Sequence, residues 1–263
     1  MSFQPVLPSS GLTGWRFLQK TYDSQLNVFS ASAARQREAS YFTEKIGQVT
    51  SAAELVADRR LLGVALGAFG LQSDLQNTYF VRKILEDGST SRDGLANRLS
   101  DKRYLDFTRA FGLGPGEVRR TSQPAAMAEI LQQHRVASFE VAVGEQDDTM
   151  RIALYAQRSL TDLATEPISA NARWFKVMSL PPLRTMMETA LGLPSSFGRI
   201  DIDQQKSVFE DKLAGLTGSK NIAQFADPEA LEKLTTTYLA RAQINAITTA
   251  ASPMKTALML LQS

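Results

Sequence analysis

The sequence predicts an all-α fold, a helical bundle built from two diverged copies of a multi-helix unit. Two observations carry this prediction. Apolar residues recur at helical spacing along most of the chain, and one characteristic helix ending returns later in a similar form. The best candidate for a strand, residues 138–143, lies inside a helical pattern, so we expect no sheet.

The returning feature is the helix ending Ala68-Phe69-Gly70-Leu71. It recurs as Ala110-Phe111-Gly112-Leu113 and as Ala190-Leu191-Gly192-Leu193. Similar segments follow the first and third of these in the same order, so that Phe80 matches Phe209 and Asp101 matches Asp227. An Ala-x-Gly-Leu ending is common in helices, but three ordered matches favour a duplication.

Composition limits the class of protein. The chain has 263 residues, of which 43% are hydrophobic and 21% charged, as is usual for a folded globular protein. The net charge is +2 and the basic residues are scattered, which gives no reason to expect nucleic acid as a partner. There is no cysteine, which excludes disulfides, thiolate nucleophiles and cysteine-ligated metals. We expect no secretory signal, because residues 1–14 have no basic n-region and no apolar h-region. We expect no integral membrane segment, because the longest apolar run, residues 61–71, is too short to cross a bilayer.

The chain is expected to open with a flexible leader, residues 1–14, rich in Pro, Ser and Gly. An amphipathic helix follows, and its apolar stripe consists of Trp15, Leu18, Tyr22, Leu26 and Phe29. Two interpretations are open. The stripe either packs on the chain's own core or forms an exposed arm that docks on another subunit or partner.

Residues 15–114 form the first predicted helical unit. Ser30 or Ser32 is expected to cap a helix that runs to Ile46, and Thr50 or Ser51 with Glu54 makes a capping box for the next. A buried helix with Gly63, Gly67 and Gly70 on one face follows, then short helices that carry Phe80 and Tyr104. The glycine-rich stretch 112–116 is interpreted as a helix stop and linker, because a phosphate-binding loop would follow a strand and end in Lys-Ser or Lys-Thr.

Residues 115–170 are predicted as connecting helices, one from Pro124 to Gly144 and one capped by Asp147 or Asp148. Residues 171–263 form the second, diverged unit. Its methionines between Met178 and Met187 either fill the core or line a binding groove. Residues 195–203 are expected to be an inserted loop, and Asp227-Pro228 to open a long helix.

The search for reactive groups gives no catalytic residue, no cofactor-binding residue and no metal ligand. His134 is the one histidine, so a multi-histidine or His–Cys metal site is impossible within one chain. A Ser–His–Asp triad is formally possible, but no nucleophile elbow is present, and a histidine at the edge of the core is favoured. The paired carboxylates, such as Asp201 and Asp203, lie where helix capping explains them. We therefore expect a protein that is not an enzyme.

Several segments together resemble a bacterial family of unknown biochemical function whose members are commonly encoded among flagellar genes. The segments are Gly14-Trp15-Arg16-Phe17-Leu18-Gln19, Tyr41-Phe42-Thr43-Glu44-Lys45-Ile46, Asp58-Arg59-Arg60-Leu61-Leu62, Ala68-Phe69-Gly70-Leu71, Leu95-Ala96-Asn97-Arg98-Leu99 and Arg151-Ile152-Ala153-Leu154-Tyr155. The second copy departs most, with Leu191 in the place of Phe69.

The resemblance implies a role in the flagellum, and two hypotheses follow. The protein is either a structural or accessory component that is exported to the flagellum or basal body, or a cytoplasmic assembly chaperone or regulator that binds a partner's helix. Its partners would be other flagellar proteins or further copies of itself. The candidate partner-binding residues are the stripe Trp15, Leu18, Tyr22, Leu26 and Phe29 and the C-terminal Leu258 and Leu261. An exposed arm would favour the first hypothesis, and an arm folded beside an open apolar groove would favour the second.

Overall fold

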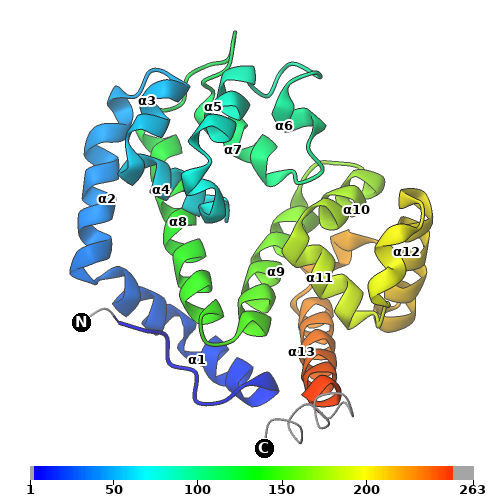
Figure 1. The fold of residues 1–263 in the computed structure, drawn as a ribbon. Coiled ribbons are helices and arrows are strands. Elements are labelled where there is room, and N and C mark those ends of the chain that lie inside the picture. Colours follow the sequence, from blue (N-terminus) through cyan, green and yellow to red (C-terminus); the bar gives the residue numbers. More distant parts are fainter. Residues whose placement is uncertain (1–2, 251–263) are drawn as a thin grey trace, which may run out of the picture. The chain divides into compact units, whose positions relative to one another are not determined.

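The computed structural model describes residues 3–250, and Figure 1 traces its helices. Within this range all regular structure is helical and no strand forms, which confirms the predicted fold class. Contacts between residues divide the chain into two compact units: unit 1 is Met1–Val6 with Lys20–Glu145, and unit 2 is Leu7–Gln19 with Gln146–Ser263. The separate connecting region predicted for residues 115–170 is therefore absent from this division, because its two helices belong to different units.

Unit 1 contains most of the first half of the chain. Its elements are the second part of α1 (Gly11–Ser30), then α2 (Ala33–Lys45), the 3-10 turn η1 (Ile46–Gln48), α3 (Ala52–Ala57), α4 (Arg59–Ala68), η2 (Gln72–Gln76), α5 (Thr78–Asp87), α6 (Leu95–Arg98), α7 (Arg103–Phe111) and α8 (Pro124–Gly144).

Unit 2 contains the first part of α1 and the second half of the chain. Its other elements are α9 (Asp148–Thr165), α10 (Ala170–Ser179), α11 (Pro181–Ala190), η3 (Ser195–Arg199), α12 (Ile202–Thr217), η4 (Ile222–Ala226) and α13 (Pro228–Ala250). Residues 195–203, predicted as a loop, thus contain a 3-10 turn and the start of α12, where Asp201 accepts hydrogen bonds from the first backbone N–H groups.

Helix α1 packs into the chain's own core, which is the first of the two interpretations that the sequence left open, and it is not an exposed arm. Trp15 and Leu18 are 0% exposed, and Leu26 and Phe29 are 7% and 6% exposed. In unit 1, Phe29 and the half-buried Tyr22 both make edge contacts with the ring of Phe139 on α8. The leader is also held in place, because the side-chain amide of Gln25 donates to the Val6 carbonyl and accepts from the Val6 N–H.

The centre of unit 1 is α4, whose sequence gives it caps at both ends. Asp58 accepts hydrogen bonds from the N–H groups of Arg60 and Leu61, which begins the helix. Residues 61, 62 and 64–68 are buried, as predicted, and α4 contacts both α2 and α8. Gly67 allows the closest approach, because a Cβ atom at this position would lie 2.5 Å from Nδ1 of His134 on α8.

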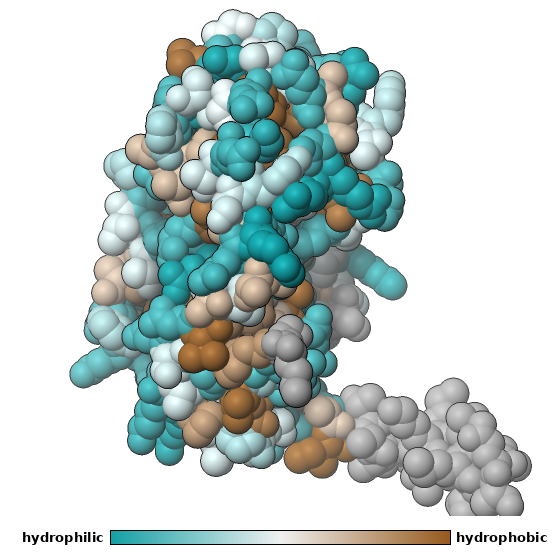
Figure 2. Space-filling model, turned by 90° about the vertical axis from the view of Figure 1, so that its left-hand side faces the viewer, coloured by the Kyte–Doolittle hydropathy of each residue, from teal (hydrophilic) through white to brown (hydrophobic). Residues whose placement is uncertain are grey.

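Helix α2, which packs on α4, is largely polar. Its single buried residue is Phe42, and its remaining side chains are partly or fully exposed. Figure 2 shows the face that carries α2, which is mainly hydrophilic, with apolar side chains gathered in its lower part. Helix α3 is capped as the sequence predicts. Ser51 accepts from the Glu54 N–H, and the Glu54 carboxylate accepts from the Thr50 N–H.

The order of elements in unit 1 returns in unit 2, which supports the predicted duplication. In both units a serine caps a helix (Ser51 before α3, Ser169 before α10), and a single residue links that helix to the next. The second helix ends at a glycine, and a 3-10 turn, a helix, a short helical turn and a further helix follow.

The two glycine stops have the same geometry. Gly70 has φ +68° and Gly192 has φ +66°, the left-handed region that glycine adopts most readily. The N–H of Leu71 donates to the Leu66 carbonyl, and the N–H of Leu193 donates to the Glu188 carbonyl, so each helix closes with the six-to-one bond of a Schellman motif.

The core of unit 2 contains the methionines whose role the sequence leaves open. Met178, Met186 and Met187 are at most 5% exposed, so they fill the core. Trp174 stacks on Phe209 of α12 with ring centroids 5.9 Å apart, and its Nε1 donates to the Lys220 carbonyl at 2.9 Å. These contacts fasten α10 to α12 and to the turn that follows it.

Candidate functional site

Unit 1 has a groove between α2 and α8, here called the α2–α8 groove. Its volume is about 470 Å³, within the range of ligand-binding sites. Its apolar lining comes from both sides: Ala39 and Phe42 on α2 with Ile46 at the start of η1, and Met127, Ala128 and Leu131 on α8. Small side chains such as Ala39 and Ala128 leave room between the helices that larger ones would fill.

One end of the groove is polar. His134 lies there, 8% exposed as a residue, with its Nε2 atom 3.3 Å from the Glu38 carboxylate and 3.3 Å from the Ser138 hydroxyl oxygen. Glu38 also pairs with Arg35 at 3.0 Å. Because a carboxylate can only accept, Nε2 must carry the proton in this arrangement. A histidine at the edge of the core, as the sequence favoured, is therefore confirmed.

The geometry at His134 differs from that of a catalytic triad. In a triad the acid holds Nδ1 while the nucleophilic hydroxyl bonds to Nε2. Here Glu38 and Ser138 lie at the same ring nitrogen, and Nδ1 is buried against Gly67 with no hydrogen-bond partner among the described residues. Nε2 cannot act as the base for Ser138 while it donates to Glu38, so this cluster is no charge-relay system.

The charged side chains at the His134 end of the groove carry a net positive charge. The hydrogen bond from His134 lowers the pKa of Glu38, helped by Arg35 and opposed by burial, so the carboxylate is held in its ionised form. Arg135 on α8 donates instead to neutral oxygens, from Nε to the Ser30 hydroxyl at 2.7 Å and from Nη2 to the Asn27 amide oxygen at 2.6 Å. With Glu38 engaged by Arg35, the guanidinium of Arg135 leaves this end of the groove positive.

The residues predicted to bind a partner are not brought together at one surface. Trp15 and Leu18 lie in the core of unit 2, and Leu26 lies in the core of unit 1. Phe29, beside Tyr22 at the Phe139 ring, is the one member of the stripe that lines the α2–α8 groove. Leu258 and Leu261 lie outside the described residues, so the prediction made for them stays a prediction.

Sequence reasoning missed the groove itself. Ala39, Phe42 and Ile46 have helical spacing in the sequence, but this spacing is the same whether another helix covers the apolar face or leaves it open. Ala39 and Ala128 were the available signal of a groove. Two short side chains on facing helices predict either close packing of the helices or a gap between them.

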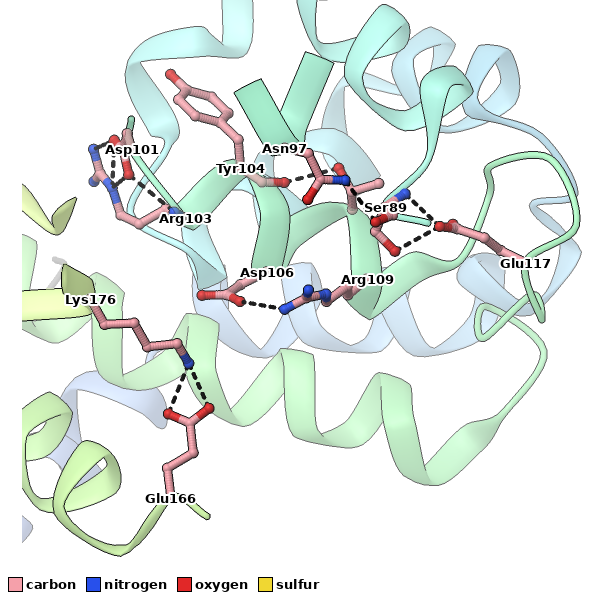
Figure 3. Close-up of polar contacts among 11 residues, drawn as sticks. Ser89, Asn97, Asp101, Arg103, Tyr104, Asp106, Arg109, Glu117, Glu166 and Lys176 are labelled. Carbon is pink, nitrogen blue, oxygen red and sulfur yellow. Dashed lines mark hydrogen bonds and ion pairs between the residues drawn. The ribbon is translucent and has the colours of Figure 1, made fainter. Parts of the chain in front are cut away.

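The glycine-rich stretch after α7 is a structural turn, as predicted. Gly112, with φ +58°, ends α7, and Gly114 packs against the backbone of Gly88. The carboxylate of Glu117 accepts from the Ser89 hydroxyl at 2.7 Å (Figure 3). It also accepts from the Gly114 N–H at 3.2 Å. The chain's own carboxylate thus takes the place that a phosphate would occupy in an anion-binding loop.

Residues 3–250 show neither a metal-binding cluster nor a membrane-spanning helix. In this part of the chain no three His, Asp or Glu side chains are placed to share a metal ion. No helix there is both long and apolar enough to cross a membrane.

Comparison with known proteins gives a family match and a similar solved structure. The family model described as "Protein of unknown function (DUF1217)" matches residues 68–231, more than half of the chain, from the end of α4 to the start of α13. The X-ray crystal structure of a protein from Agrobacterium tumefaciens is similar in fold, with a TM-score of 0.73 and 24% sequence identity over 92% of this chain and 99% of that one. No protein of curated function matches this chain.

Proposed function

This chain belongs to the DUF1217 family of proteins of unknown function, and we propose that it acts without catalysis, by binding a helix of a partner protein in the α2–α8 groove. One observation carries the proposal: α1 is folded onto the body of the chain, and an apolar groove stands open beside its end at Phe29. This is the arrangement expected of a chaperone or regulator that holds another protein's helix.

The dimensions of the groove suit a helix. Two helices form its sides, and α2, with 13 residues, is about 20 Å long. A partner helix of roughly three to four turns would therefore match α2 in length, with its apolar stripe over the apolar lining and one of its ends at the polar end of the groove. Apolar side chains at helical spacing on the partner would enter the space over Ala39 and Ala128, where the lining side chains are short.

The biological setting of the proposal comes from the resemblance of the sequence segments to proteins encoded among flagellar genes. We propose that the protein is a cytoplasmic chaperone or regulator of flagellar assembly. Its partner would be another flagellar protein that exposes an amphipathic helix before assembly, since such a helix needs its apolar face covered.

Site-specific photo-crosslinking in living cells tests the groove. A benzophenone amino acid is placed at Gln132, which lines the groove, and in a matched strain at Gln133, which is exposed on the same helix but lies outside the lining. The pair Gln36 and Arg37 repeats the comparison on α2. We expect one partner to be captured from Gln132 and Gln36, and much less from Gln133 and Arg37. Equal capture from both members of each pair, or none, would contradict the proposal.

The second candidate is an exported structural or accessory component of the flagellum or basal body that assembles with other flagellar proteins or with itself. Its support is in the sequence: the chain has no cysteine, and four consecutive apolar residues, 258–261, require cover. Fractionation into cytosol, periplasm and basal bodies, with and without a working flagellar export gate, separates the candidates. Gate-dependent presence in basal bodies favours export, and purely cytosolic protein favours the chaperone or regulator.

A further inference from the structure

The polar end of the α2–α8 groove indicates what kind of helix fits it. We infer that the partner helix carries an acidic side chain beside its apolar stripe, and that this carboxylate lies against Arg135 and Arg35. The inference rests on the proposed function, because it assumes that a helix occupies the groove.

Arg135 is the first reason. Its Nε and Nη2 groups donate to Ser30 and Asn27, which are neutral, so the hydrogen bonds hold the guanidinium in position without neutralising its charge. Its Nη1 group takes part in neither bond. Arginine held in a fixed orientation is well suited to a carboxylate, because little further side-chain freedom is lost when the pair forms.

Arg35 is the second reason. Its guanidinium lies over the ring of Phe29, 5.0 Å from the centroid, and reaches Glu38 through Nη1. The Arg35 side chain is 39% exposed, so an incoming group can reach it. Arg35 and Arg135 therefore stand on opposite helices at the same end of the groove, the end that contains Phe29 and Ser30.

Glu38 gives the reason against a basic partner. Among the described residues that line the groove, it supplies the one carboxylate, and both His134 and Arg35 already contact it. A lysine on the partner helix would meet two guanidinium groups and a carboxylate that is already engaged. The groove thus discriminates between acidic and basic helices by repulsion as well as by attraction.

A selection experiment tests the inference before any partner has been identified. A displayed library of helix-forming peptides, with apolar positions fixed at i, i+3, i+4 and i+7 and the flanking positions randomised, is selected against the full chain. A parallel selection uses the Ala128→Arg variant, in which the groove is filled. Circular dichroism and thermal unfolding of each variant establish that it is folded.

We expect groove-dependent peptides to be enriched in Asp and Glu at flanking positions. Selected peptides should bind about tenfold more weakly to the Arg35→Gln/Arg135→Gln double variant, which corresponds to the loss of a partly desolvated charge pair. The Arg35→Glu/Arg135→Glu double variant should instead select Lys and Arg. The matched control Arg37→Gln, on α2 but outside the groove lining, should leave binding unchanged.

The outcomes separate the two claims. Groove-dependent peptides without an acidic bias would overturn the inference and leave helix binding intact. No groove-dependent peptide at all would overturn the proposed function. If a fatty acid bound at the groove and no peptide did, the positive end would serve a small amphiphile, and both claims would be wrong.

Discussion

The helix pairs α3–α4 and α10–α11 end at glycine stops of the same geometry, yet the surfaces just before the stops differ. Three residues before the stop, unit 1 has Gly67, packed against the His134 ring, and unit 2 has the half-buried Thr189. The stop glycine is required by the backbone, because φ is positive in both copies. Gly67 is required by a side chain on a neighbouring helix. The backbone requirement is thus the same in both helix pairs, while the side-chain contacts differ with each unit's own neighbours.

The largest expected effect tests whether the units unfold separately. Leu61→Ala in unit 1 and Leu183→Ala in unit 2 each remove a side chain that is at most 3% exposed, at a cost of about 2–5 kcal/mol of unfolding free energy. Both tryptophans, Trp15 and Trp174, belong to unit 2. Leu183→Ala should therefore lower the urea midpoint seen by tryptophan fluorescence, while Leu61→Ala should shift only part of the circular dichroism transition.

One outcome of the same experiment would contradict the separate unfolding of the two units. If Leu61→Ala lowers the fluorescence midpoint as far as Leu183→Ala does, the two units unfold as one cooperative system, and the division by contacts has no thermodynamic counterpart.

The next effect concerns the close approach that distinguishes α4 from α11. A Cβ at Gly67 would lie 2.5 Å from Nδ1 and 2.8 Å from Cε1 of His134, so Gly67→Ala should destabilise unit 1 by about 1–3 kcal/mol in urea unfolding. Gly63, on the same helix, has no heavy atom within 4 Å of its Cβ position, and Gly63→Ala should stabilise by roughly 0.5–1 kcal/mol.

A double-mutant cycle identifies the cause of the Gly67 effect. In a His134→Ala background the obstructing ring is gone, so Gly67→Ala should cost much less. An unchanged cost there would mean that α4 backbone strain, and not the ring, penalises the methyl group.

A smaller and shared effect is expected at the two stops. Gly70→Ala and Gly192→Ala place a Cβ at φ near +67°, and each should cost about 1 kcal/mol. Gly192→Ala should cost slightly more, because the Cβ would lie 2.2 Å from Nη1 of Arg241, against 3.3 Å from Nη1 of Arg103 at Gly70. Gly215→Ala, on α12 with open space around it, is the control. The free energy of unfolding of the three variants is measured by chemical denaturation. If only one of Gly70→Ala and Gly192→Ala were destabilised, the two stops would not play the same role.

The smallest effect is a pH dependence that belongs to unit 1. The hydrogen bond from His134 lowers the pKa of Glu38 below 4.5, so ionised Glu38 contributes stability that is complete above pH 4.5 and is lost as the pH falls through the lowered value. Compared with Glu38→Gln, the wild-type chain should be more stable at pH 7, and the difference should close in acid. A difference that stays constant with pH would show that Glu38 acts through its shape and not its charge.

Much of the fold could be predicted from the sequence, because its signals are local. Helix α8 begins and ends where Pro124 and Gly144 indicate, and Asp58, Asp147 and Asp227 cap helices as their side chains suit them to do. The glycine stops were equally visible, since an apolar helix followed by Gly-Leu is a Schellman sequence.

The candidate site was less predictable, because it depends on what covers an apolar stripe. The stripes of α1 and α2 both have helical spacing, yet Trp15 is fully buried while Ala39 faces a groove. The helical spacing of apolar residues shows that one face of a helix is apolar, but it does not show which element packs against that face. For the same reason, the division of the chain at Glu145 and Gln146, between two equally good helices, could not be predicted.

The division of α1 between the two units has a practical consequence for expressing fragments of the chain. Residues 7–19, near the start of the polypeptide, complete a unit whose remaining residues begin at Gln146, while residues 20–30 of the same helix belong to the other unit. A fragment that starts at Gln146 would lack the Trp15 and Leu18 side chains that fill its interior. Such a fragment should be rescued by adding a peptide of residues 7–19, in the manner of split-protein complementation.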